Sequence, residues 1–321
     1  MPRSDSPPPS RARLLLAALV LAAFAALLAL RVHHWGGLDQ TALFYVGLPA
    51  TIALLVVLTV RARSAMGVTM AATTVCLALA GPLLGEGMVC LLIAAPLVYG
   101  VVAVVAWTAG ALVTWRNRSR HALLAVPLLF ALALEGVAGT SLLPREDRGE
   151  GHVLVAATAQ SVAAALAAPP EYAAPDALLL RAVPFPEPVS ASGEGLAVGD
   201  TRLVRFTPRR TLEFGAEPTP RHMALRITES EVREDGGRVV FEVVEDTAFA
   251  NWMDMRGAEA VWHADGEGTR LAWSIDYERT YEPSWYFGPV QSYATDLAAE
   301  YLAATFGTAA ALGTSAPEGS R

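Results

Sequence analysis

The stretch ALLAVPLLFALALEGVAGTSLL, residues 122–143, contains one charged residue, Glu135, among 22. Three arginines come directly before it: Arg116, Arg118 and Arg120. At about 1.5 Å per residue, a helix of this length crosses the roughly 30 Å hydrocarbon core of a bilayer. The sequence before it is almost wholly apolar, whereas the sequence after it is charged and has the pattern of strands. The stretch therefore divides a predicted membrane half from a predicted soluble half.

The membrane half contains four further apolar runs, so the sequence predicts a region of five transmembrane helices over residues 11–143. The four runs cover residues 14–30, 41–60, 66–84 and 88–114. Residues 1–10 are rich in proline and serine and are predicted to be disordered. Arginines occur in alternate loops, which by the positive-inside rule places the N-terminus in the cytoplasm and the soluble half on the outer face.

Composition excludes several classes of function. Residues 1–144 carry nine arginines and four acidic residues, whereas residues 145–321 carry fifteen arginines and 27 acidic residues. The soluble half is thus acidic and has no basic stripe, which argues against nucleic-acid binding. The absence of lysine and the richness in alanine and proline suggest a bacterial source, and the apolar runs then indicate a protein of the inner membrane.

No motif for a metal, a phosphate group or a dinucleotide occurs, so we expect no metal and no cofactor. The two cysteines, Cys76 and Cys90, lie in apolar runs and form no disulfide framework. Within the membrane half, Glu135 is the polar candidate. An ionisable group in the middle of a membrane helix is costly and is a functional candidate by default. The alternative is a protonated or hydrogen-bonded glutamate that holds the helices together.

The soluble half opens with a charged connector, residues 144–151, a short strand over residues 152–158 and a helix over residues 159–167. A stretch rich in Pro, Ala and Gly follows and has no clear assignment. Further strands are predicted over residues 200–207, 222–230, 238–246, 258–264 and 269–281.

The last predicted strand alternates between apolar and polar residues. One face carries Leu271, Trp273, Ile275 and Tyr277, and the other carries Ala272, Ser274, Asp276 and Glu278. This alternation is typical of an antiparallel sheet with one covered face.

The chain closes with a predicted amphipathic helix. It runs from Pro289 to Phe306, with Gly307 as the stop and a flexible tail over residues 307–321. Its apolar stripe consists of Val290, Tyr293, Leu297, Tyr301 and Leu302.

This order of elements resembles the helix-grip superfamily, also called START-like or SRPBCC, which includes polyketide cyclases and lipid-transfer domains. The residues that carry the resemblance are Ala159–Ala168, Val198-Gly199-Asp200 before Thr201–Phe206, Arg226-Ile227-Thr228-Glu229, Phe241-Glu242-Val243, and Gly268-Thr269-Arg270-Leu271 with Trp273. The resemblance covers about residues 150–306. It implies an α+β domain over residues 152–306, in which a curved antiparallel sheet wraps around the C-terminal helix, here fused to a polytopic membrane region.

In that superfamily an apolar cavity lies between the sheet and the terminal helix. The resemblance implies that such a cavity is lined here by Phe241, Trp262, Trp273 and Ile275 from the sheet and by Val290, Tyr293 and Leu297 from the helix. The alternative is that these side chains fill a solid core. The polar candidates for facing the cavity are Arg226, Glu229, Glu242 and Asp276. The alternative is that such an acid is paired with Arg205 or Arg226 in a structural ion pair.

Three functions follow from these observations. The first is a membrane-tethered binding module, not an enzyme, that holds a lipid or another apolar small molecule for sensing, transfer or presentation. The second is a structural membrane protein with a packed outer domain that binds another protein. The third is an enzyme of the cyclase or aromatase type that uses Glu229, Glu242 or Asp276 for acid–base chemistry. We favour the first, because a cavity close to the bilayer shortens the path of an apolar ligand through water.

Overall fold

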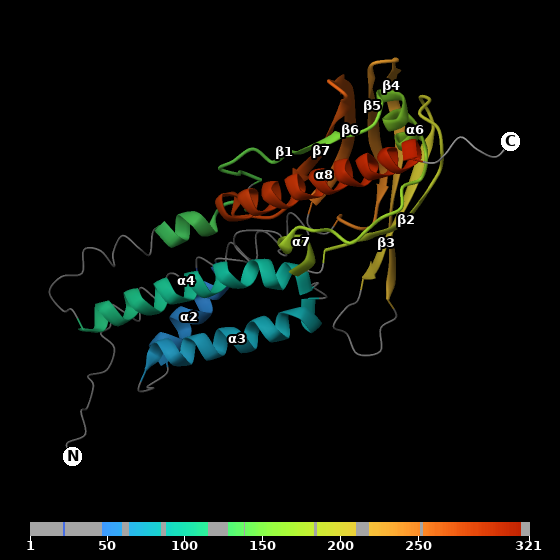
Figure 1. Ribbon diagram of the computed structural model, residues 1–321. Coiled ribbons are helices and arrows are strands. Elements are labelled where there is room, and N and C mark those ends of the chain that lie inside the picture. Colours follow the sequence, from blue (N-terminus) through green and yellow to red (C-terminus); the bar gives the residue numbers. More distant parts are fainter. Residues whose placement is uncertain are drawn as a thin grey trace, which may run out of the picture. The chain divides into compact units, whose positions relative to one another are not determined.

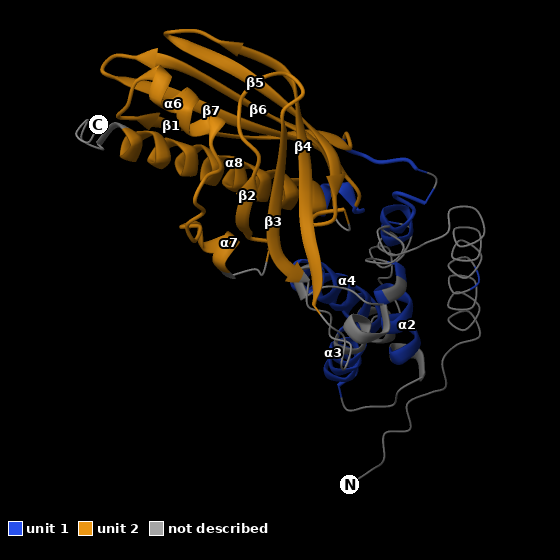
Figure 2. Ribbon diagram, turned by 90° about the vertical axis from the view of Figure 1, so that its right-hand side faces the viewer, with its two compact units in different colours: residues 1–86, 90–143, 281–286 blue, residues 87–89, 144–280, 287–321 orange. Residues whose placement is uncertain are grey.

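The computed structural model describes residues 22, 47–59, 64–84, 88–114, 128–137, 139–182, 185–209, 218–250 and 253–315. The chain divides into two compact units, which Figure 2 shows in different colours. The first unit comprises residues 1–86, 90–143 and 281–286, and the second comprises residues 87–89, 144–280 and 287–321.

The described part of the first unit is mainly helical (Figure 1). Helices α2, α3 and α4 cover Leu48–Thr59, Ala65–Leu84 and Met88–Thr114. The last two agree with the third and fourth apolar runs. The first run, residues 14–30, lies outside the described residues except for residue 22.

One stretch of the described helices is long and apolar enough to cross a membrane. It covers Cys90–Gly110 and has a mean hydropathy of 2.4, while a shorter apolar stretch covers Ala65–Leu77. The part of the chain that the structure describes thus contains one candidate span, not the five-helix bundle predicted from the sequence.

Glu135 does not lie in the middle of a helix, contrary to the prediction. The helical residues 128–133 are followed by a turn over residues 134–137, in which Gly136 has a φ of 80°. This left-handed conformation favours glycine and commonly ends a helix. The Glu135 Oε1 atom accepts a hydrogen bond from the Leu142 backbone N–H at 3.0 Å and another from the Ser284 hydroxyl. Glu135 therefore joins the end of this helix to the segment 281–286 of the same unit.

The second unit is built on a seven-stranded antiparallel sheet of order β1-β7-β6-β5-β4-β3-β2. The strands are β1 (Glu146–Val155), β2 (Pro188–Ser192), β3 (Thr201–Arg209), β4 (Thr219–Val232), β5 (Gly236–Asp246), β6 (Met253–Asp265) and β7 (Gly268–Arg279). The helices of the C-terminal half are α6 (Ala159–Ala167), α7 (Leu178–Ala182) and α8 (Ser284–Ser315). Register shifts interrupt the β2–β3, β3–β4, β4–β5 and β6–β7 ladders. Such irregularities increase the twist of a sheet and help it to curve.

The first strand begins earlier than predicted, because β1 starts at Glu146, inside the predicted connector. The inward positions of this strand include Gly149 and Gly151, both buried, where an apolar side chain is the usual strand signal. An ideal Cβ atom built on Gly151 would lie 2.1 Å from the Glu300 backbone nitrogen of α8. Glycine at this position therefore allows α8 to lie against β1.

Helix α8 is longer than predicted at both ends. Pro289 lies inside it, and Gly307 does not end it. A Cβ atom on Gly307 would lie 3.0 Å and 3.2 Å from side-chain atoms of Val155 and Val153. Gly307 thus serves close packing of α8 on β1, and the helix continues to Ser315.

The core of the second unit lies between the concave face of the sheet and the helices α6 and α8 (Figure 1). Its most deeply buried side chains include Val162 of α6, Trp262 of β6, Leu271 of β7 and Ala303 of α8. A curved antiparallel sheet with a long C-terminal helix across it fits the helix-grip arrangement, as the sequence predicted.

Candidate ligand-binding cavity

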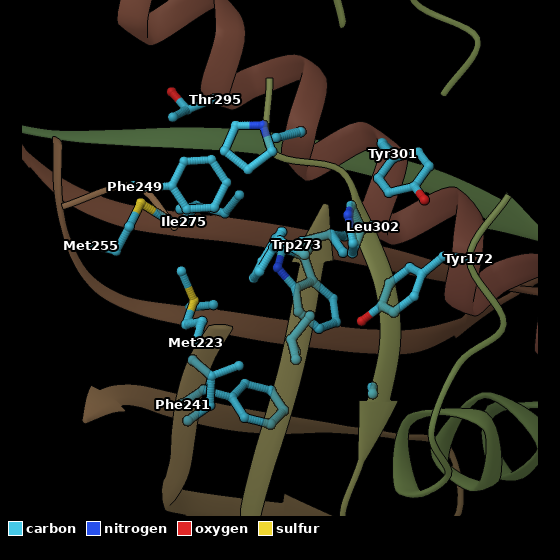
Figure 3. Close-up of a pocket in the computed structure, with 18 of the residues that line it drawn as sticks. Tyr172, Met223, Phe241, Phe249, Met255, Trp273, Ile275, Thr295, Tyr301 and Leu302 are labelled. Carbon is cyan, nitrogen blue, oxygen red and sulfur yellow. The ribbon is translucent and has the colours of Figure 1, made fainter. Parts of the chain in front are cut away.

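A cavity of about 190 Å³ lies in the second unit between the sheet and α8 (Figure 3). The sheet, α8 and the segment that connects α6 to β2 form most of its wall, and Leu166 of α6 and Phe249 between β5 and β6 complete it. The lining residues include Val204, Phe206, Met223, Leu225, Phe241, Met253, Met255, Trp273 and Ile275 of the sheet, Ala294, Thr295, Ala298, Tyr301, Leu302 and Phe306 of α8, and Leu166, Pro170, Tyr172, Pro175, Leu180 and Phe185.

The strands present these residues by simple alternation, because successive side chains of a strand point to opposite faces. In β7, Trp273 and Ile275 point inward, and the buried positions of this strand follow the predicted alternation from Leu271 to Tyr277. In β6, Met253 and Met255 point inward in the same way.

Three stacked aromatic rings separate the cavity from the solid core. The ring of Trp273 lies between those of Phe241 and Phe306, with centroid distances of 5.9 Å and 5.0 Å and interplanar angles of 19° and 4°. All three residues line the cavity and also belong to the core cluster. The stack therefore forms one wall of the cavity, with rigid rings held on both the sheet and α8.

Methionines are concentrated in another part of the wall. Met223, Met253 and Met255, three of the seven methionines in the sequence, line the cavity together with Phe249. Figure 3 shows Met223 and Met255 on the same side as Phe249. Methionine side chains are unbranched and adapt to irregular shapes. This part of the wall can therefore adjust to ligands of somewhat different shapes.

Three of the seven predicted apolar site residues line the cavity, namely Phe241, Trp273 and Ile275. Trp262 does not, because it lies in the solid core with 1% of its surface exposed. Tyr293 is 58% exposed, and Val290 and Leu297 are also absent from the cavity wall.

The face of α8 that borders the cavity carries smaller residues than predicted. Ala294, Thr295 and Ala298 lie there, together with Leu302 and Phe306. The predicted stripe follows the largest apolar side chains, whereas the close approach of α8 to β1 requires small ones. The predicted stripe is therefore rotated by about one residue from the face that packs on the sheet.

The four polar candidates lie outside the cavity, and they form ion pairs, as the alternative interpretation expected. They occupy positions on the outer face of the sheet, where arginine and acidic residues pair across neighbouring strands. Arg226 Nη2 and Glu242 Oε2 are 2.6 Å apart, Arg148 Nε and Asp276 Oδ1 are also 2.6 Å apart, and Glu229 pairs with Arg238. The strand pairing places Arg226 directly opposite Glu242 and Arg148 directly opposite Asp276. These are cross-strand pairs, which stabilise a sheet but do not reach its concave face.

Two tyrosines stand at the cavity wall. The Tyr301 hydroxyl donates a hydrogen bond to the Ala173 carbonyl oxygen at 2.7 Å. The Tyr172 hydroxyl has no hydrogen-bond acceptor among the described residues, and in Figure 3 it points toward the Trp273 ring. Burial raises the pKa of both phenols, so both remain protonated at neutral pH and act as donors.

No sequence pattern indicates Arg202, a buried residue at the start of β3 that lines the cavity. Its Nη2 atom donates to the carbonyl oxygens of Ala167, at 3.1 Å, and of Leu166, at 3.4 Å, near the end of α6, and also to that of Gly195. Its Nη1 atom donates to the Thr201 carbonyl oxygen at 3.4 Å. Burial lowers the pKa of Arg202, but arginine remains charged in proteins.

No family model and no curated protein matches the chain. Several solved structures match about half of it. Ginseng major latex-like protein 151 from Panax ginseng is 18% identical, with 49% of this chain and 99% of that chain covered and a TM-score of 0.27. The AHSA1-like protein from Aeromonas hydrophila is 12% identical, with coverage of 55% and 100% and a TM-score of 0.32. Norcoclaurine synthase from Thalictrum flavum is also 12% identical, with coverage of 55% and 100% and a TM-score of 0.34.

Proposed function

We propose that the C-terminal half of this chain is a binding module that holds an apolar small molecule between its sheet and α8. The observation that carries the proposal is the cavity itself, whose wall consists almost entirely of aliphatic, aromatic and methionine side chains. Concave sites with apolar walls and few polar groups are typical of small-molecule binding.

The volume of the cavity limits the size of the ligand. An engineered protein cavity of about 150 Å³ binds benzene, and sites for drug-sized ligands measure roughly 300–1,000 Å³. The cavity of about 190 Å³ lies near the lower of these sizes. A molecule with one or two rings, or a short single chain, therefore suits it better than a lipid with two acyl chains.

We favour binding without catalysis. The acids proposed for proton transfer, Glu229, Glu242 and Asp276, are paired with arginines on the outer face of the sheet. Among the described residues, Glu187 is the only acid at the cavity wall, and it is exposed. The same ion pairs make the outer face polar, which disfavours the alternative of a broad apolar surface for a protein partner.

We further propose that the N-terminal half tethers this module to a bacterial inner membrane, with the N-terminus in the cytoplasm and the C-terminal half outside. The apolar stretch Cys90–Gly110 and the arginines of alternate loops support this proposal. Its ligand would then have the bilayer as its source or its destination.

The substitution Ala298→Phe tests ligand binding, because it places a ring in the cavity from the α8 side. We expect naphthalene, a two-ring probe, to bind the full-length chain in lipid nanodiscs saturably at one molecule per chain. We expect this binding to weaken by about tenfold or more in Ala298→Phe, because the ring occupies the ligand's volume. Equilibrium dialysis against nanodiscs of the same lipid content measures it.

The matched control is Ala304→Phe, which adds the same ring to an exposed position of α8 outside the cavity wall. It should bind naphthalene as the wild type does. Equal uptake by all three proteins, beyond that of empty nanodiscs, would contradict the proposed function.

A further inference from the structure

The polar groups at the cavity wall are mainly hydrogen-bond donors, and three of them have unused capacity. One is the buried Nε1–H group of Trp273, which has no hydrogen-bond partner among the described residues. The Tyr172 hydroxyl has no acceptor among the described residues, and neither does the Nε atom of Arg202. The remaining side-chain hydroxyls are satisfied, because Thr295 donates to the Gln291 carbonyl oxygen at 2.8 Å and Tyr301 donates to that of Ala173. A ligand that complements this wall must supply an acceptor.

Arg202 is a buried cation that forms no ion pair among the described residues. Only 7% of its surface is exposed. Asp200 and Glu194 are its nearest acidic influences and raise its pKa, but neither forms an ion pair with it. Asp200 instead accepts a hydrogen bond from the Ala197 backbone N–H at 2.8 Å. The hydrogen-bond partners of the Arg202 side chain are therefore neutral carbonyl oxygens. They accept hydrogen bonds from its Nη atoms, but none of them is a carboxylate that pairs with its charge.

The carbonyl oxygens of Leu166 and Ala167 account for part of the role of Arg202, since a cation near a helix C-terminus is stabilising. This structural role uses the Nη2 atom. This structural role does not explain why the Arg202 side chain lines the cavity, and it does not explain why its Nε atom has no acceptor. The exposed Glu187 is the one acid at the wall, and solvent screens its repulsion of an anion.

We infer that the ligand of this cavity is a small apolar molecule that carries an anionic oxygen group, a carboxylate in the first place, and that Arg202 is its counterion. Tyr172 supplies a second donor at the same wall. Guanidinium and carboxylate groups form strong charge-assisted hydrogen bonds, and an arginine that is already buried has lost its hydration before the ligand arrives. This inference rests on the proposed function, because it specifies the ligand of the same cavity.

Three probes of similar shape test the inference on the full-length chain in nanodiscs: naphthalene, 2-naphthamide and 2-naphthoate. Binding is taken as the difference between the wild type and Ala298→Phe, which removes the contribution of the lipid. We expect 2-naphthoate to bind about tenfold or more tightly than 2-naphthamide, its neutral analogue, since hydrogen bonds to charged groups exceed neutral ones by about this factor.

The variant Arg202→Met should lose this preference, so that 2-naphthoate binds at least about tenfold more weakly while naphthalene binding is unchanged. Retained naphthalene binding also shows that the variant is folded. The conservative variant Arg202→Lys should keep most of the preference, and Tyr172→Phe should reduce it by a smaller factor.

Equal affinity of the wild type for 2-naphthoate and 2-naphthamide would overturn the inference, and so would an equal loss of all three probes in a folded Arg202→Met variant. If Arg202→Met does not fold, Tyr172→Phe and the wild-type comparison of the two probes still decide the question. A different result, in which no probe distinguishes the wild type from Ala298→Phe, would contradict the proposed function itself.

Discussion

The substitution Gly151→Ala is expected to destabilise the second unit by about 3 kcal/mol, the upper end of the usual range for overpacking. A Cβ atom at this position would lie 2.1 Å from the Glu300 backbone nitrogen and 2.4 Å from the Ala299 carbonyl carbon. Both are backbone atoms of α8, so no side-chain rotation relieves the clash, and the helix must move away from β1. Hydrogen exchange of the α8 amides in the full-length chain measures the loss, since exchange reports the free energy of local opening.

The neighbouring substitution His152→Ala is the control. His152 lies in the same strand and is exposed, so its removal should change exchange little. If Gly151→Ala and His152→Ala gave the same protection of α8, then the close approach of this helix to β1 would be wrong.

The substitution Trp262→Ala is expected to cost about 3–5 kcal/mol of unfolding free energy, the usual range for removing a large aromatic side chain from a core. Trp262 is 1% exposed and packs in the solid core. Gly237, which pairs with Trp262 across β5 and β6, leaves room for the indole ring, because a Cβ atom at this position would lie 2.4 Å from it. Denaturant unfolding followed by near-ultraviolet circular dichroism measures the change.

Trp262→Phe should cost less, because a smaller ring leaves part of the packing in place. The exposed neighbour His263 provides the surface control, and His263→Ala should leave the unfolding midpoint nearly unchanged. A loss in Trp262→Ala as small as that in His263→Ala would show that this part of the core is not solid.

The architecture of the second unit was predictable from the sequence where hydrophobic alternation is strong. The alternation of Leu271, Trp273, Ile275 and Tyr277 corresponds to the buried face of β7. The hydrophobic pattern did not predict the positions at which glycine allows a helix and a strand to pack closely. Gly149 and Gly151 carry no hydrophobic signal in β1, and Gly307 looks like a helix stop although it serves close packing.

The cavity was predictable only in part. Strand alternation indicated the inward positions of Trp273 and Phe241, but not which inward residues lie at the cavity and which, such as Trp262, lie in the solid core. The acids of the outer face were misplaced by the family resemblance, although strand alternation already places Glu242 and Asp276 on the faces opposite to their neighbours Phe241 and Ile275. Tyr172 and Arg202 depend on how an irregular segment and the end of α6 meet the sheet, which no local pattern encodes.

The central claim, that the space between the sheet and α8 binds an apolar small molecule, is tested most directly by the methionine methyl groups. Met223, Met253 and Met255 line the cavity, whereas Met66 and Met70 lie in α3. In the full-length chain labelled with ¹³C-methyl methionine, we expect naphthalene to shift the three cavity resonances saturably, through the ring current of a bound probe. The resonances of Met66 and Met70 should not saturate, and Ala298→Phe should abolish the cavity shifts. Cavity resonances that remain unchanged at saturating naphthalene, or that change no differently from those of Met66 and Met70, would contradict the claim.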